Sequence, residues 1–297
     1  MKRGLAAVLA SGAALTGLAA AAPAGATAPA TKTPATSTPG TTTPGTDLGG
    51  SPVTCTSNRP GLADRLERDI AGALHGHADA SALALYDRTT ATSCTFRADQ
   101  AFDSASVVKV TILGALLRQA QEQHRVLTAR ELSLTSAMIT KSDNDATNAL
   151  WHQLGHTGIQ HFLDVAGMRD TVPGPQGRWG RTQITAGDQV KLLRLLTSDN
   201  PVLDTNARTY ALQLMNRVVP EQRWGTPAGA PTTATVHVKN GWVPLDTHGW
   251  RVHSVGVFTG NGHDYGMAVL SHGHATMENG IATVESAARV INRDLNL

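Results

Sequence analysis

The chain has 297 residues, a formal net charge of +2, 41% hydrophobic residues and 16% charged residues. This near-neutral balance, with no run of basic residues, gives no support to nucleic-acid binding. The two cysteines lack partners at metal-ligand spacing, and neither a His-Glu-x-x-His motif nor a glycine-rich phosphate loop is present, so we expect no metal or other cofactor.

The first 26 residues have the pattern of a secretory signal peptide. A basic start, Met1-Lys2-Arg3, precedes an Ala/Leu/Gly run and then Ala24-Gly25-Ala26, the small-x-small pattern of a signal-peptidase site. A membrane anchor is the alternative, but the run is short, rich in alanine and broken by Pro23. No cysteine follows the run, which argues against a lipid-anchored lipoprotein. We therefore expect a secreted, extracellular protein, free or associated with the cell wall.

Residues 27–53 are almost entirely Thr, Pro, Ala, Gly and Ser. Such a segment cannot bury enough apolar surface to offset its chain entropy, so we expect a disordered linker. Residues 54–297 are enough for one sizeable domain. No later run is long and apolar enough to cross a membrane. We expect a monomer with no membrane span once the signal peptide is removed.

Cys55 and Cys94 are the cysteines of the domain. In an exported protein a disulfide is the default state, and only one pairing is available. It would tie the start of the domain to a strand just ahead of Ser106. Closing a loop of about 40 residues should stabilise the fold by roughly 4 kcal/mol in the chain-entropy model. Two unrelated buried thiols are the alternative.

Hydrophobic periodicity predicts the elements of the domain in chain order. An amphipathic helix over 61–74 precedes short strands over 81–86 and 93–96, which a turn over 87–90 separates. Further helices are expected from Ser106, from the capping box at Thr128, and over 144–154, 157–166, 186–197 and 203–218, with a Gly/Pro-rich loop over 170–185. Strands over 235–239, 251–258 and 265–270 then precede a closing helix over 277–292.

This order indicates an α+β fold rather than an alternating α/β fold. The simplest assembly is one antiparallel sheet built from both ends of the chain. The terminal helices would cover one face of that sheet, and the central helices would form an all-helical subdomain beside it. We expect the active site in the cleft between the sheet and this subdomain.

Ser106-Val107-Val108-Lys109 stands at the head of the most apolar helix. Positions three apart share a helix face, so the Ser106 hydroxyl and the Lys109 amine are neighbours. A lysine activates a serine only if its pKa is lowered, and burial and the positive end of a helix both lower it. These four residues specify a possible acyl-transfer centre, although a Ser-x-x-Lys pattern arises by chance about once in a chain of this length.

Two further motifs follow in the order that such a centre requires. Ser142-Asp143-Asn144 ends the capped helix, and Lys239-Asn240-Gly241 ends a strand. With Ser-x-x-Lys they resemble the S-x-x-K, S-D-N and K-T-G signature of class A β-lactamases and penicillin-binding proteins. The segment from Ser142 to Asn148 also resembles the S-D-N-x-A-x-N segment of this family, and the resemblance spans the whole domain.

The resemblance implies a role for each motif residue. Ser106 is the nucleophile that forms an acyl-enzyme, Lys109 is its general base or polarises it, and Ser142 relays a proton to the leaving nitrogen. Asn144 binds substrate and orients Lys109, while Lys239 supplies positive charge to Ser142 and to a substrate carboxylate. The backbone N–H groups of Ser106 and Trp242 form the oxyanion hole, and the remaining substrate-binding positions are Asn240 and Gly241.

Flanking residues have less distinctive roles. Asp143 is expected to turn the loop, and Asn148 to hold the later loop from its helix. Arg251, on the following strand, is suited either to a substrate carboxylate or to a structural contact. Trp242 and its neighbours Pro244 and Trp250 crowd the strand edge beside the site.

The chain departs from the family pattern in its means of deacylation. The β-lactamases of this family carry a glutamate in the loop after the helical block, where it activates the hydrolytic water. Here no glutamate lies between Glu131 and Glu221. The loop has Asp170 as its carboxylate, and Gln176 is not a base. Since general-base help is typically worth about 10² to 10⁴ in rate, the acyl-enzyme would persist.

Two other departures concern the shape of the site. Asn240 replaces the threonine of K-T-G with a bulkier residue that has no hydroxyl. The step from Ser106 to Ser142 is short, which indicates a more open cleft.

Three hypotheses follow. The chain is a secreted serine hydrolase acting on a β-lactam or another amide or ester, with a small-molecule or peptidoglycan-like substrate. Alternatively, it is a penicillin-interactive binder or sensor that acylates on Ser106 without turnover. In the third hypothesis it is a cell-wall-associated protein whose site is a relic, which the intact motif set argues against.

Overall fold

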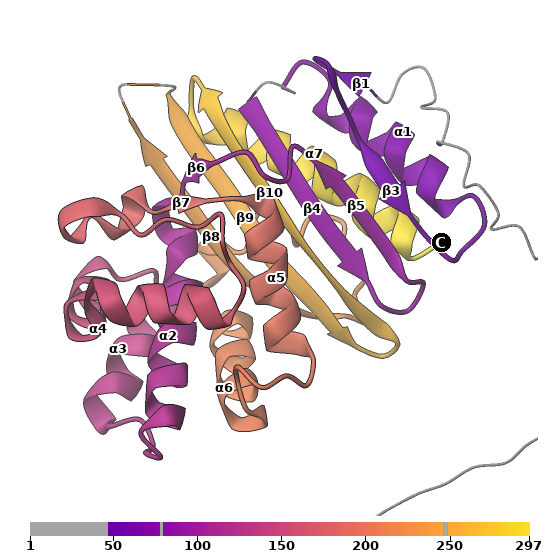
Figure 1. Cartoon of the computed structure of the whole chain (residues 1–297). Helices are drawn as coiled ribbons and strands as arrows, with labels where there is room; N and C mark the ends of the chain where they lie inside the picture. The colour runs from indigo at the N-terminus through magenta and orange to yellow at the C-terminus, as the bar shows by residue number, and fades with distance from the viewer. Residues whose placement is uncertain (1–46, 78–79, 246, 248) are drawn as a thin grey trace, which may run out of the picture. The chain divides into compact units, whose positions relative to one another are not determined.

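The strand runs expected from the sequence form one six-stranded antiparallel sheet in the order β3-β5-β4-β10-β9-β8 (Figure 1). The structure is a computed structural model, and it describes residues 47–77, 80–245, 247 and 249–297. The strands of the sheet are β3 (Thr54–Thr56), β4 (Ser81–Asp87), β5 (Thr92–Phe96), β8 (Thr235–Pro244), β9 (Trp250–Gly260) and β10 (His263–His274). The last three are longer than expected, and β3 was not foreseen.

Successive side chains of a strand point to opposite faces of the sheet, and both faces of the central strands are buried. In β4, Ala82 and Ala84 belong to the hydrophobic core on the side of the helical block, while Leu83 and Leu85 belong to a second core on the opposite side. Because both faces are covered, every residue of β4 is buried.

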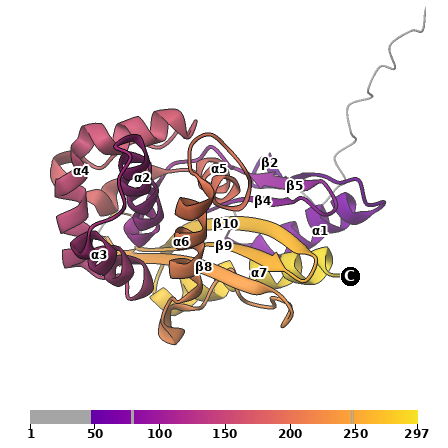
Figure 2. The same cartoon turned by 90° about the horizontal axis from the view of Figure 1, so that it is seen from below.

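The terminal helices α1 (Leu62–Leu74) and α7 (Met277–Leu295) cover the second face, as expected. Figure 2 shows them together on one side of the strands. In α1 the spacing of Leu62, Leu66 and Ile70 places these buried side chains on one stripe of the helix. This pair of helices fixes the back of the sheet and leaves its other face to the helical block.

Five helices form that block on the first face: α2 (Val108–Glu122), α3 (Ala129–Thr140), α4 (Asn144–Val165), α5 (Ala186–Thr197) and α6 (Thr205–Asn216). Helix α2 is buried along nearly its whole length, which makes it the centre of the block. Gly114 allows α4 to approach closely, because a Cβ at this position would lie 2.5 Å from Phe162 Cζ.

Local signals set the helix ends. Both hydrogen bonds of the expected capping box form between Thr128 and Glu131 at the start of α3. Gly155 interrupts α4 with φ 65° and ψ 172°, which separates the two helices expected over 144–154 and 157–166. The α+β arrangement predicted from the sequence is therefore confirmed.

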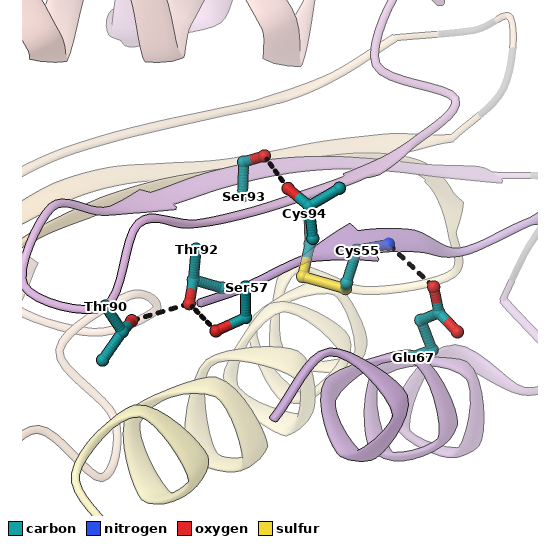
Figure 3. Close-up of a disulfide and its surroundings, with 8 residues drawn as sticks. Cys55, Ser57, Glu67, Thr90, Thr92, Ser93 and Cys94 are labelled. Carbon is teal, nitrogen blue, oxygen red and sulfur yellow. Dashed lines mark hydrogen bonds between the residues drawn. A yellow bond between two sulfur atoms is a disulfide. The ribbon is translucent and has the colours of Figure 1, made fainter. Parts of the chain in front are cut away.

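The disulfide between Cys55 and Cys94 is confirmed, and it joins β3 to β5 where the two residues are paired in register (Figure 3). The backbone N–H of Cys55 also donates to Glu67 Oε1 of α1 over 2.9 Å. This edge of the sheet is thus tied both to its neighbouring strand and to a terminal helix.

The end of the expected linker is ordered. Residues 47–53 include a small two-stranded sheet of β1 (Asp47–Leu48) and β2 (Ser51–Pro52). Leu48 and Val53 are buried in the core beneath α1 and α7, so the folded domain starts earlier than predicted. The signal peptide and residues 27–46 lie outside the described residues. Within the described ranges, no helix has the length and hydrophobicity that crossing a membrane requires.

Candidate active site

Ser106 lies in a 3₁₀ turn, η2 (Ala105–Val107), that leads directly into α2. Ala105 adopts a left-handed backbone conformation with φ 45°, which is costly for a residue with a Cβ. The strained residue turns the chain just before Ser106. Ser106 is partly exposed and lines a cavity of about 460 Å³. Most of the following helix α2 is buried.

Lys109 is fully buried one turn after Ser106. Its Nζ donates to Ser142 O at 2.7 Å, to Ser142 Oγ at 3.0 Å and to Asn144 Oδ1 at 2.8 Å. Burial lowers the pKa of Lys109 to about 7, and the nearby Asp143 charge opposes this fall. Near neutral pH, a large fraction of this amine is therefore uncharged and able to accept a proton.

Lys239 of β8 approaches the same hydroxyl from the sheet. Its Nζ donates to Ser142 Oγ at 3.0 Å and to the backbone oxygen of Asn240 at 2.7 Å. Lys239 is fully buried, and its burial, together with the charge of Lys109, lowers its pKa well below the usual value. Ser142 Oγ thus lies between two buried amines that resist being charged together.

The geometry of Ser142 depends on a strained backbone. Its φ is 58°, in the left-handed region, between the end of α3 and the start of α4. Asp143 then caps α4 by accepting from Ala146 N at 2.7 Å, which confirms its expected role in turning the chain. In the part of the chain that the structure describes, no hydrogen bond joins Ser106 Oγ to Lys109, whose Nζ contacts are to Ser142 and Asn144.

Strand β8 lies directly against the nucleophile's turn at Gly241. A Cβ added there would lie 2.8 Å from the backbone nitrogens of both Ser106 and Val107. Only glycine permits this approach, which brings the next residue, Trp242, to the wall of the cavity. The expected oxyanion-hole donors, the N–H groups of Ser106 and Trp242, therefore belong to two segments in close backbone contact.

The expected substrate contact of Asn240 is not available, and of the two roles open to Arg251 the structure shows the structural one. The Asn240 side chain is fully buried and donates to Gln222 O and Trp224 O, each at 2.9 Å, so it does not line the cavity. Arg251 is also buried. Its guanidinium binds Asp103 at 3.2 Å and the backbone oxygens of Thr247 and Gly249, which makes its role structural. The sequence motif located Asn240 but gave no sign of the direction of its side chain.

Asn144 and Asn148 line the cavity from α4. Asn144 Oδ1 accepts from Lys109 Nζ at 2.8 Å. Asn148 Oδ1 accepts from Trp179 Nε1 at 2.8 Å, which confirms that it holds the later loop. Trp179 belongs to a second 3₁₀ turn, η4 (Trp179–Arg181), and its ring centroid lies 4.8 Å from Lys109 Nζ. Sequence reasoning missed this contact, because an isolated tryptophan in a loop without periodicity has no predictable partner.

The rest of the loop offers no general base to the cavity. The described lining residues from this loop are Gly177, Arg178, Trp179, Gly180 and Arg181. Asp170 is exposed and is not among the residues that line the cavity, and its backbone N–H donates to Asp188. No acidic side chain occurs among the described lining residues, so the cavity has a positive character.

The chain matches the model of the Beta-lactamase enzyme family over residues 65–132 and 127–295. It is 27% identical over 218 residues to "Putative lipoprotein LppW" of Mycobacterium tuberculosis, which covers 70% of this chain and 68% of that protein, and the Mycobacterium bovis protein of the same name matches equally.

Solved structures show the same fold at low identity. A class A beta-lactamase from Bacteroides cellulosilyticus superposes with a TM-score of 0.67 at 16% identity, covering 80% of this chain and 99% of that one. A beta-lactamase from Xanthomonas campestris gives a TM-score of 0.67 at 18% identity, with coverage of 79% and 98%. The TLA-3 extended-spectrum beta-lactamase gives 0.68 at 14% identity, with coverage of 78% and 98%.

Proposed function

The chain belongs to the beta-lactamase enzyme family, and on that basis we propose that it is an exported serine hydrolase whose Ser106 forms an acyl-enzyme with a β-lactam or a related amide or ester. The observation that carries the proposal is the convergence of two buried lysines, Lys109 and Lys239, on the hydroxyl of Ser142. This arrangement supplies a proton acceptor and a proton donor on the two sides of a cleft that Ser106 lines.

Acylation begins when Ser106 Oγ adds to the acyl carbon and the neutral amine of Lys109 takes its proton. The neutral amine has two N–H groups and one lone pair, so it keeps at most two of the three hydrogen bonds to Ser142 and Asn144 and turns the lone pair to the Ser106 proton. The acyl oxygen becomes negative, and the N–H groups of Ser106 and Trp242 stabilise it. As the C–N bond breaks, Ser142 gives its proton to the leaving nitrogen, and the proton on Lys109 returns to Ser142.

Lys239 polarises the relay from the side of the sheet. It shares Ser142 Oγ with Lys109 at equal distances of 3.0 Å. Because the burial of both amines opposes two adjacent positive charges, a proton gained by one lysine is readily passed on. The charge that remains stabilises the negative oxygen that forms on Ser142 during the transfer.

The electrostatics of the cavity favour an anionic acyl donor. Arg178 and Arg181 line it, and both are exposed. Lys239 and Arg251, by contrast, are buried and engaged in other contacts. We therefore assign carboxylate recognition to the arginines of the loop. A cavity of about 460 Å³ suits a small molecule or the end of a peptidoglycan-like peptide.

Slow turnover is the second part of the proposal. No carboxylate or imidazole occurs among the described residues that line the cavity, and Asp170 is not one of them. This favours the alternative in which the protein is a penicillin-interactive binder or sensor that acylates and then persists as the acyl-enzyme. The mycobacterial relatives are described as lipoproteins, which supports an envelope or extracellular location for this chain as well.

A two-probe experiment separates these functions. The protein without residues 1–26 is incubated with a fluorescent penicillin and with a chromogenic cephalosporin, alongside a Ser106→Ala variant. We expect one equivalent of stable label on the wild type and none on the variant, with little steady hydrolysis of the cephalosporin. Rapid steady hydrolysis that depends on Ser106 would instead identify an efficient hydrolase. Absence of both reactions would overturn the β-lactam assignment.

A further inference from the structure

The indole of Trp179 separates Lys109 from the cavity. Its ring centroid lies 4.8 Å from Lys109 Nζ, and Trp179 lines the cavity while Lys109 does not. The hydrogen bonds of the amine are to Ser142 and Asn144. The ring therefore covers a face of the amine that these polar partners leave open, and Lys109 has no exposed surface.

Both the side chain and the backbone of Trp179 are held in place. Its Nε1–H donates to Asn148 Oδ1 at 2.8 Å. Its backbone oxygen accepts from Thr182 N at 3.0 Å and from Ser104 Oγ at 3.3 Å, and Ser104 stands two residues before the nucleophile. These anchors come from α4, from the loop itself and from the nucleophile's own segment, so the position of the ring is determined from three directions.

Hydrolysis of an acyl-enzyme needs a water molecule that reaches both the acyl carbon and a base. The water oxygen must bond to the acyl carbon while a base takes one of its protons. The ester bond to Ser106 Oγ then breaks, and that oxygen takes up a proton. Lys109 lies one turn after Ser106, and the indole covers its amine from the loop side.

We propose that Trp179 is the positioning residue that keeps hydrolytic water away from Lys109 after Ser106 is acylated and thereby sets the lifetime of the acyl-enzyme. The proposal rests on the proposed function, since it concerns the second half-reaction of the same site. The loop has no glutamate, and the indole of Trp179 occupies the space between Lys109 and Asn148 instead.

The same space is suited to a carboxylate. A glutamate at position 179 would start from a backbone that is already fixed, with the Lys109 amine and the Asn148 amide as its neighbours. An adjacent cation keeps a carboxylate ionised, and an ionised carboxylate can accept a proton from water. Trp179→Glu should therefore turn a site that retains its acyl group into one that releases it.

The test follows acylation and deacylation separately. Each variant is labelled with a penicillin, excess penicillin is removed, and the fraction of labelled protein is followed by intact mass. Trp179→Glu should shorten the adduct lifetime about tenfold or more relative to Trp179→Gln, because a general base is typically worth about 10² to 10⁴. Trp179→Ala should shorten it less, by admitting water without a base. Trp179→Phe keeps an aromatic ring over the amine but loses the Nε1–H bond to Asn148, so it should shorten the lifetime less than Trp179→Ala does.

Asn148 gives a second route that leaves the indole intact. Asn148→Ala removes the acceptor for Trp179 Nε1 and should shorten the lifetime, whereas Asn148→Gln keeps an amide acceptor without adding a carboxylate and should shorten it less. If Trp179 had only a structural role, its substitution would instead lower the melting temperature and the acylation rate. Both quantities are therefore measured for every variant. Trp250→Phe serves as a control for loss of an indole outside the cavity.

The experiment distinguishes failure of the role of Trp179 from failure of the proposed function. If the wild type takes up label and the Trp179→Glu, Trp179→Ala and Asn148→Ala proteins keep it equally long, the role of Trp179 is wrong while the proposed function stands. If no protein takes up label, the proposed function fails and the role of Trp179 falls with it.

Discussion

The charge of Asp143 raises the pKa of Lys109, against the larger lowering that burial causes, and the balance leaves the amine with a pKa of about 7. Asp143 stands beside Ser142, whose backbone and side-chain oxygens both bind this amine. A carboxylate that caps a helix therefore also adjusts the base next to the nucleophile. The proton affinity of Lys109 can be changed from outside the cleft.

The pH dependence of acylation follows from this balance. Only the neutral amine accepts a proton, and its fraction grows as the pH rises through about 7, so the acylation rate should rise with pH and level off above this value. Asp143→Asn removes the charge that raises the pKa, and the inflection should move to lower pH. The asparagine keeps an oxygen for the cap to Ala146. Stopped-flow labelling from pH 5 to 9 measures this shift, which Asp145→Asn, a control in the same helical turn, should not produce.

The strained backbone at Ser142 predicts an ordering of two variants. Ser142→Ala and Ser142→Gly both remove the oxygen that Lys109 and Lys239 share, so both should lose most of their acylation rate. Glycine adopts a φ of 58° without steric cost, whereas alanine adopts it only at a cost in free energy. The glycine variant should therefore be more stable than the alanine variant by about 1 kcal/mol in urea unfolding. Greater stability of the alanine variant would contradict the strain.

Asn240→Thr restores the usual family motif and should nevertheless destabilise the protein. The two N–H groups of Asn240 satisfy the buried oxygens of Gln222 and Trp224, and threonine cannot reach both. Leaving buried carbonyls without donors costs about 1 to 3 kcal/mol. Chemical denaturation measures the loss. If the threonine variant were as stable as the wild type, the hydrogen bonds of Asn240 to Gln222 and Trp224 would contribute nothing to stability.

Loss of the disulfide should lower stability without affecting chemistry. Cys55 and Cys94 lie on β3 and β5, at the opposite edge of the sheet from β8, and are separated by 39 positions in the sequence. The Cys55→Ala/Cys94→Ala protein should lose roughly 4 kcal/mol in the chain-entropy model. At temperatures where it stays folded, its rate of acylation should equal that of the wild type. A slower reaction at full folding would mean that this edge is coupled to the site.

The two arginines of the cavity predict a salt-dependent preference for anions. Arg178→Gln and Arg181→Gln should each weaken acylation by a carboxylate-bearing donor by about fivefold or less, as expected for exposed charges. The effect should shrink at high salt and disappear for the methyl ester of the same donor. Arg169→Gln changes the charge equally without altering the cavity lining, so competition labelling of the three variants isolates the local effect.

Much of this structure could be predicted from the sequence because its signals are local. The periodic apolar residues of α1, the capping box at Thr128 and the Gly260–Gly262 turn each specify structure within a few residues. The motif residues Ser106, Lys109, Ser142 and Lys239 were identified because the chemistry restricts their type and order. Pairing of the cysteines needed only their number and an exported setting.

Side-chain partners far apart in the sequence could not be predicted. The direction of Asn240 depends on where the chain between residues 220 and 224 packs against β8, and no local pattern records that packing. The contact of Trp179 with Lys109 joins positions about 70 residues apart, through a loop whose glycines and prolines show only that it turns. Tertiary packing alone determines the direction of the Asn240 side chain and the contact of Trp179 with Lys109.

The hydrogen bonds of Ser104 bear on how this site can change over evolutionary time. Its N–H donates to Thr182 O at 2.8 Å, and its hydroxyl donates to Trp179 O, so the segment that leads into the nucleophile and the loop opposite form one hydrogen-bonded unit. Gly174 tightens that unit, because a Cβ there would lie 2.1 Å from Arg178 O. Replacing this loop with a loop of different length from an efficient hydrolase would displace Ser106. New chemistry is therefore more accessible to this lineage through single substitutions within the existing loop than through exchange of the loop as a module.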